Sequence, residues 1–123
     1  MRFLAHGGIV PEAIEAMRRH EQMCHVMTEL EGGVEASGDP AVLLPLVQKK
    51  QWELLTTDSA FVQALYEGKV LFSGVVVLIL DAEKQVEGVD RLFERYHRLT
   101  PRRLYTVTGT RVKVRQLPGA GQV

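Results

Sequence analysis

The strongest constraint on the fold is the run Gly-Val-Val-Val-Leu-Ile-Leu at residues 74–80. An uninterrupted apolar run rich in β-branched residues is typical of a parallel strand that is buried on both faces of a sheet. Such a strand needs helices on both sides to cover it, and the flanking segments carry helical patterns. The run therefore predicts an α/β protein with a mainly parallel central sheet, joined by right-handed crossovers.

Strands and helices alternate along the chain. Strands are expected at residues 1–5, 24–30, 52–57 and 74–80, and a hairpin at 102–117 turns around Thr108-Gly109-Thr110. Helices are expected at residues 11–20, 40–50, 58–68 and 86–99. Residues 31–38 are polar and contain glycine, which predicts a loop. Pro45 removes one helical hydrogen bond, so a kink or break is expected near residues 41–45, and Pro101 is expected to stop the last helix.

The length of 123 residues suits one domain with a hydrophobic core, expected over residues 1–118, followed by a short flexible tail at 119–123. With 46% hydrophobic and 24% charged residues, the composition is that of a soluble globular protein. The chain has no apolar run long enough for a bilayer and no signal-peptide pattern, which predicts a cytoplasmic protein without a membrane partner. The lone Cys24 predicts a buried, inert thiol.

Basic residues are concentrated near the end of the chain. Residues 91–123 contain 8 Lys and Arg against the single acid Glu94, although the whole chain has a net charge of zero. In the expected hairpin, alternation places Arg111, Lys113 and Arg115 on one face, opposite two valines. A polyanion such as RNA would suit this face, but a solvated basic surface explains it equally well.

Four polar side chains are candidates for a functional site. His6, Asp58 and Asp81 follow expected strands, and Asp39 opens a helix whose end is expected to face the same edge of the sheet. In an open α/β sheet, ligands bind beyond the carboxyl ends of the strands. Carboxylates that converge there would bind Mg²⁺ or Mn²⁺, which can activate a water molecule against a phosphodiester.

Each candidate also has a purely structural interpretation. Asp39 and Asp58 precede helices, where an aspartate caps unpaired N–H groups for about 1 kcal/mol. Asp81 opens a polar loop, where a solvated turn residue is the usual case, and His6 beside two glycines fits a polar loop. The sequence has no His or Cys residues at the spacing of a zinc site, no phosphate-binding glycine motif and no nucleophile-elbow motif of a hydrolase.

The order of segments resembles the PIN-like nuclease superfamily, above all small bacterial PIN-like domains of the kind found near toxin–antitoxin loci. The resemblance spans nearly the whole chain and lies in MRFLAHGGIVPEAIEAMRRH, GDPAVLLPLVQKKQWELLTTDSAF, GVVVLIL and LYTVTGTRVKVRQLP. It implies a three-layer α/β/α fold with a C-terminal β-hairpin. Proteins of this family gather carboxylates around a divalent ion and cut RNA.

The resemblance assigns Asp39 and Asp58 as metal ligands and catalytic acids. In a nuclease of this kind, we expect His6 to be an auxiliary ligand or substrate contact in the catalytic site, and Arg111, Lys113 and Arg115 to contact the RNA backbone. Two acids of the family pattern are missing: His6 or Gly7 stands at the first-strand acid, and Ala60 at the second acid of the Thr-x-Asp-x-Asp-Phe motif.

Two hypotheses follow. The first is a Mg²⁺- or Mn²⁺-dependent endoribonuclease, toxin-like and with weakened or lost activity. The second is an inert module that binds RNA or a protein partner such as an antitoxin. A homo-oligomeric subunit without RNA affinity is a third alternative.

Overall fold

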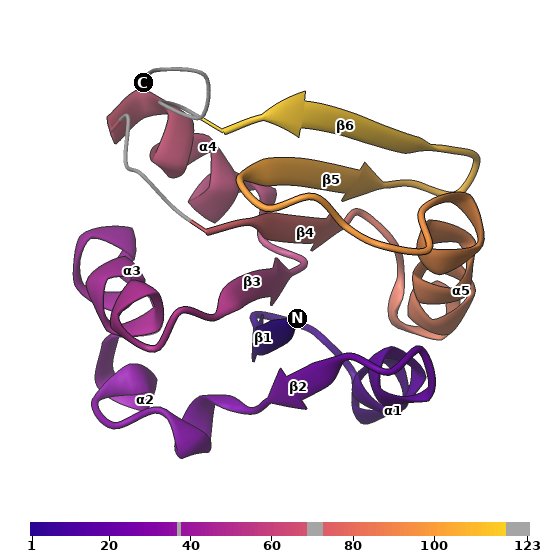
Figure 1. Cartoon of the computed structure of the whole chain (residues 1–123). Coiled ribbons are helices and arrows are strands. Elements are labelled where there is room, and N and C mark those ends of the chain that lie inside the picture. Colours follow the sequence, from indigo (N-terminus) through magenta and orange to yellow (C-terminus); the bar gives the residue numbers. More distant parts are fainter. Residues whose placement is uncertain (37, 69–72, 118–123) are drawn as a thin grey trace.

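Six strands form one sheet in the order β2-β1-β3-β4-β5-β6 in the computed structural model, which describes residues 1–36, 38–68 and 73–117 (Figure 1). The strands are β1 (Arg2–His6), β2 (Met23–His25), β3 (Glu53–Thr56), β4 (Val75–Leu78), β5 (Arg103–Val107) and β6 (Val112–Gln116). Strands β1 to β5 are parallel, and β6 pairs antiparallel with β5. The expected α/β class with a mainly parallel sheet is confirmed.

Helices cover both faces of the sheet. The helices are α1 (Pro11–Arg19), α2 (Gly33–Ala36), α3 (Pro40–Lys49), α4 (Ser59–Gly68) and α5 (Gln85–Arg95), with short 3-10 turns η1 (Met27–Glu29) and η2 (Ala82–Lys84). Helices α1 and α5 pack side by side on one face, and α3 and α4 lie on the other (Figure 1). No helix in the described ranges has the length and apolar character needed to cross a bilayer.

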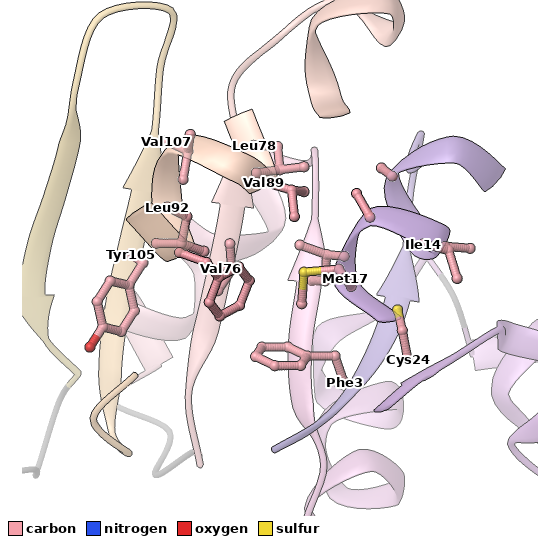
Figure 2. Packing of buried hydrophobic residues seen from close by; sticks show 14 of the residues in the cluster. Phe3, Ile14, Met17, Cys24, Val76, Leu78, Val89, Leu92, Tyr105 and Val107 are labelled. Carbon is pink, nitrogen blue, oxygen red and sulfur yellow. The ribbon is translucent and has the colours of Figure 1, made fainter. Parts of the chain in front are cut away.

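The strands supply alternate residues to two hydrophobic cores. In β4, Val76 and Leu78 point toward α1 and α5, whereas Val75 and Val77 point toward α3 and α4. Figure 2 shows the first core, where Met17 of α1 and Leu92 of α5 pack over the sheet. All four residues of β4 are buried, as a strand covered on both faces requires.

The predicted loop at residues 31–38 is wrong, because residues 33–36 form the short helix α2. Its first turn is held by two backbone hydrogen bonds, from Gly33 N–H to the Leu30 carbonyl at 2.9 Å and from Ala36 N–H to the Gly32 carbonyl at 3.2 Å. Gly33 and Ala36 are buried, so tertiary packing stabilises a turn that the polar local sequence does not favour.

A kink or break was predicted near residues 41–45; the break is wrong, since α3 continues through Pro45 to Lys49, and the kink stays a prediction. Proline leaves the carbonyl four residues earlier, that of Ala41, without a helical partner. Ala41 and Pro45 are both exposed, so water can hydrate that carbonyl. Leu43, Leu44 and Val47 are buried on the other side and keep the helix on the sheet.

The last helix ends earlier than expected. Helix α5 stops at Arg95, where Tyr96 takes an extended conformation, well before Pro101. Tyr96 and Leu99 still pack against the first core, from the connection to β5 rather than from the helix. The predicted tail at 119–123 lies outside the described residues, so its boundary stays a prediction.

Candidate functional site at the carboxyl edge of the sheet

The strand order creates a switch point beside β1. The chain passes from β1 to β2 on one side and then to β3 on the other side of β1. The connections after β1 and β3 therefore leave the sheet at neighbouring positions, which is where open α/β sheets bind ligands. His6 is the last residue of β1 and lies opposite Thr56, the last residue of β3, so His6 belongs to the strand and does not follow it.

His6 and Thr56 form a buried polar pair at this switch point. Nδ1 of His6 and the Thr56 hydroxyl are hydrogen-bonded at 2.8 Å. The same hydroxyl accepts the Asp58 N–H at 3.0 Å. The His6 ring is 4% exposed, and its centroid lies 4.4 Å from that of the Phe61 ring in α4. The imidazole is therefore packed into the protein beneath the start of α4.

A second hydrogen bond joins the two loops. Gly8 N–H donates to the Thr57 hydroxyl at 2.9 Å. Gly7, the residue before it, has φ of +71°, and a Cβ at this position would lie 3.2 Å from the same hydroxyl oxygen. Glycine is favoured at position 7 because a side chain there would be strained by the backbone and crowded by Thr57.

Gln85 ties the loop after β1 to α5. Its amide Nε2 donates to the Gly8 carbonyl and its Oε1 accepts the Val10 N–H, both at 2.9 Å. The side chain is 2% exposed, so both ends of a buried amide are satisfied. The loop that would hold a ligand in a nuclease is therefore fixed from two sides, by Thr57 and by Gln85.

The two predicted acids both cap helices. The Asp58 carboxylate accepts the Phe61 N–H at 3.0 Å at the start of α4, and the Asp39 carboxylate accepts the Ala41 N–H at 3.0 Å at the start of α3. Both aspartates are exposed. The capping interpretation is confirmed, and the catalytic assignment of Asp39, Asp58 and His6 stays a prediction.

The residues at the switch point do not fit a hard divalent cation. In the part of the chain that the structure describes, no three His, Cys, Asp or Glu side chains lie close enough to hold a metal ion, so His6, Asp39 and Asp58 do not form such a group. His6 is buried and bonded to Thr56, and imidazole is a poor ligand for Mg²⁺. The remaining acids are engaged as helix caps.

Asp81 lies beside a separate hollow at the end of β4. This hollow, of about 380 Å³, is lined by Thr57, Asp81, Lys84 and residues 78–80. Asp81 precedes η2 without capping it through its side chain, and it is exposed. These facts agree with a solvated turn residue.

The basic face of the hairpin is present in the structure. Arg111, Lys113 and Arg115 are exposed, whereas Val112 is buried and Val114 half-buried, as the alternation predicts. Strand β6 is the edge of the sheet (Figure 1). Lys113 and Arg115 line a hollow of about 230 Å³ beside the first turns of α4, on the face of the sheet that α4 covers.

Two residues with raised pKa values, Cys24 and Glu53, lie outside the switch point. Burial raises the pKa of the Cys24 thiol to about 11, which makes it a weak nucleophile. Burial also raises the pKa of Glu53, but Glu53 begins β3 and so lies at the amino edge of the sheet. Neither residue belongs to the switch-point site.

Sequence reasoning missed two parts of this region. The role of Gln85 had no local signal, since it sits in a polar stretch, Asp-Ala-Glu-Lys-Gln, and its partners are 75 and 77 residues away. The hollow next to α4 depends on the pairing of β4, β5 and β6, which the sequence does not display. The Thr56-Thr57-Asp58 sequence was the local signal for the two threonine hydroxyls that bond the loop after β1.

We compared the chain with known protein families, curated proteins and solved structures. The chain matches no protein-family model, no curated protein and no solved structure.

Proposed function

We propose that the chain is a PIN-like module that binds single-stranded RNA and does not cleave it with a metal ion. The module would have the three-layer PIN-like arrangement with its C-terminal hairpin, and it would act in the cytoplasm. The observation that carries the proposal is the contrast between the two edges of the molecule. A buried, hydrogen-bonded His6–Thr56 pair occupies the switch point, whereas exposed cations line the hairpin.

The loss of metal-dependent cleavage rests on the state of the switch point. A PIN-type mechanism needs several carboxylates to hold the ion and offset its charge. Here the position after the first strand carries the buried His6–Thr56 pair, and the acid that remains nearby, Asp58, caps α4. Because the Thr56 hydroxyl and the His6 imidazole are hydrogen-bonded to each other, they hold the two loops together and are not free to bind a divalent cation.

The RNA-binding part rests on the arrangement of the hairpin cations. Alternate residues along a strand are about 6.7 Å apart, which is close to the spacing of successive phosphates in an extended single strand. Lys113 and Arg115 occupy such alternate positions on β6, and Arg111 directly precedes this strand. Cations in this pattern would contact the RNA backbone and give salt-dependent affinity. An antitoxin-like protein and a second copy of the chain are the competing partners.

The test combines binding and cleavage in one assay. Labelled single-stranded RNA is incubated with the protein in chelator, Mg²⁺ or Mn²⁺. The fluorescence anisotropy of the RNA then reports binding, and the length of the RNA fragments reports cleavage. We expect binding that falls with salt, is equal in chelator and metal, and leaves the RNA intact. Mn²⁺ should also leave the melting temperature unchanged, because a ligand that binds only the folded state would raise it.

A different result would restore the nuclease hypothesis. Cleavage that requires Mn²⁺ and disappears in an Asp39→Asn/Asp58→Asn double variant would establish a working metal site. Equal fragment yields from the wild type and the double variant would indicate a contaminating nuclease. A protein that binds no RNA at any salt concentration would overturn the RNA-binding proposal itself.

A further inference from the structure

We infer that the hollow between α4 and the hairpin holds one nucleotide of the bound RNA, with its base on an aliphatic floor and its phosphate at Lys113 and Arg115. The inference rests on the proposed function and adds to it a defined base-binding position, away from the switch point. The observations behind it concern the shape, the chemistry and the charge of this hollow.

The hollow lies beside α4, on the face of the sheet that α4 covers. Val77 of β4 and Leu104 of β5 line it but are 2% and 3% exposed, so the exposed aliphatic residue of its floor is Ile79, just beyond the end of β4. Ile79 is 49% exposed, which is unusual for a large aliphatic side chain next to a buried strand. The volume of about 230 Å³ is enough for one nucleobase. An unpaired base of a single strand can enter such a hollow, whereas the bases of a duplex stay stacked inside the helix.

Polar groups border the apolar floor. Ser59 and Gln63 of α4 and Thr106 of β5 line the hollow, and Ser59 and Gln63 are exposed. A carboxamide both donates and accepts hydrogen bonds, so Gln63 can pair with the edge of a base that lies on the floor. The apolar floor and the polar border together suit a nucleobase, which is a flat heterocycle with hydrogen-bonding groups on its edges.

Two cations complete the hollow on the side of β6. Lys113 lies opposite Thr106, and Arg115 lies opposite Leu104, in the antiparallel register of β5 and β6. No carboxylate lines the hollow in the part of the chain that the structure describes. Lys113 forms no ion pair with any described residue. A phosphate that is attached to the bound nucleoside would meet the positive charge of Lys113, with no carboxylate among the lining residues that the structure describes.

An acidic peptide is the alternative occupant, because it too would satisfy the cations. It has no feature that matches the apolar floor together with Gln63, whereas a nucleotide uses both. RNA is therefore the occupant that these observations favour, and a glutamate polymer becomes a competitor in the test.

The experiment compares RNA with a backbone that lacks bases. Anisotropy is measured in chelator with a labelled oligouridine and with an abasic oligoribonucleotide of equal length. The variants are Gln63→Ala, Lys113→Gln and, as a matched control, Lys49→Gln, an exposed lysine in the last turn of α3 that does not line the hollow. All three positions are exposed, so the variants should fold normally.

We expect the wild type to bind oligouridine about fivefold more tightly than the abasic chain, as one added hydrogen-bonded contact would give. Gln63→Ala should reduce this preference, because the contact with the apolar floor remains, and should leave abasic binding unchanged. Lys113→Gln should weaken the binding of both and reduce the salt slope by about 0.7, the value for one phosphate contact on a single strand. Lys49→Gln should match the wild type.

Three results would overturn the inference. Equal binding of oligouridine and abasic chain by the wild type would remove the base site while leaving the RNA-binding proposal in place. If polyglutamate displaced the labelled RNA at a lower concentration than unlabelled oligouridine does, the hollow would be assigned to an acidic peptide. Absence of binding to either oligonucleotide would overturn the inference and the proposed function together.

Discussion

Nδ1 of His6 and the hydroxyl of Thr56 lie 2.8 Å apart at the ends of two neighbouring parallel strands. The hydroxyl also accepts the Asp58 N–H, so one buried oxygen joins β1, β3 and the start of α4. The pair lies at the switch point, the position where open α/β sheets bind ligands. Several measurable consequences depend on the contacts around this position.

Replacing Thr56 with valine should destabilise the protein, although the side chain keeps its shape. The substitution leaves the Asp58 N–H and the His6 Nδ1 without this partner in a site where Thr56 is 0% exposed. The free energy of unfolding should fall by about 1–3 kcal/mol, as measured by urea denaturation. Thr56→Ser keeps the hydroxyl and should lose less. Equal stability of the valine variant and the wild type would contradict a stabilising role for this oxygen.

Replacing Asp58 or Asp39 with alanine should each cost about 1 kcal/mol, because each removes a helix cap. The loss should be the same in chelator and in Mn²⁺, as followed by thermal unfolding. Asp81→Ala is the control, since its side chain caps nothing and surface changes are within about 0.5 kcal/mol. A larger loss for Asp39→Ala or Asp58→Ala in Mn²⁺ than in chelator would show that the aspartate binds the ion.

Replacing Glu53 with glutamine should stabilise the protein at neutral pH. Burial raises the pKa of Glu53 above its ordinary value of 4.5, so the folded state holds this proton more tightly than the unfolded state. Stability from the protonated form is present below pH 4.5 and is lost as the pH rises through the folded pKa. The melting temperature of Glu53→Gln should therefore exceed that of the wild type at neutral pH and approach it in acid.

A matched control for this pH dependence is Glu35→Gln, at an exposed position of α2. This variant should follow the wild type at every pH. If Glu53→Gln shifted the melting temperature equally at neutral and acid pH, packing rather than ionisation would be the cause.

Replacing Gln85 with leucine should lower stability by about 1–3 kcal/mol, because the Val10 N–H and the Gly8 carbonyl lose a buried partner. The loop should also open locally, so the Val10 amide should exchange hydrogen faster than amides of the central strands. Gln48→Leu, at an exposed position of α3, is the control. Unchanged exchange at Val10 would show that the loop is held by other contacts.

The sequence predicted the elements whose periodicity was strong. The helix expected at residues 11–20 matches α1, and the apolar run at residues 74–80 located β4 and the fold class. Valines alternating with cations gave the correct faces of the hairpin. In each case, the local pattern and the tertiary burial require the same conformation, so the pattern alone was sufficient.

The prediction was wrong where tertiary contacts outweigh local preference. Pro45 does not break α3, because Ala41 and Pro45 are exposed, so water can hydrate the unpaired Ala41 carbonyl, while Leu44 and Val47 remain buried. Helix α2 forms in a polar, Gly-containing stretch through burial of Ala36.

The candidate site was only partly predictable. The capping role of Asp58 follows from its position before a helix, but the buried Gln85 depends on contacts 75 and 77 residues apart. No local pattern encodes such a contact.

The interior position of β1 has a consequence for how the chain folds during synthesis. Strand β1 is made first, yet it lies between β2 and β3, and its second ladder pairs with residues 53–56. Until that segment leaves the ribosome, one edge of β1 offers unpaired N–H and C=O groups beside apolar side chains such as Leu4. This edge of β1 therefore stays open to mispairing until Thr56 emerges, and the arrival of β3 both covers it and joins the two loops at the switch point.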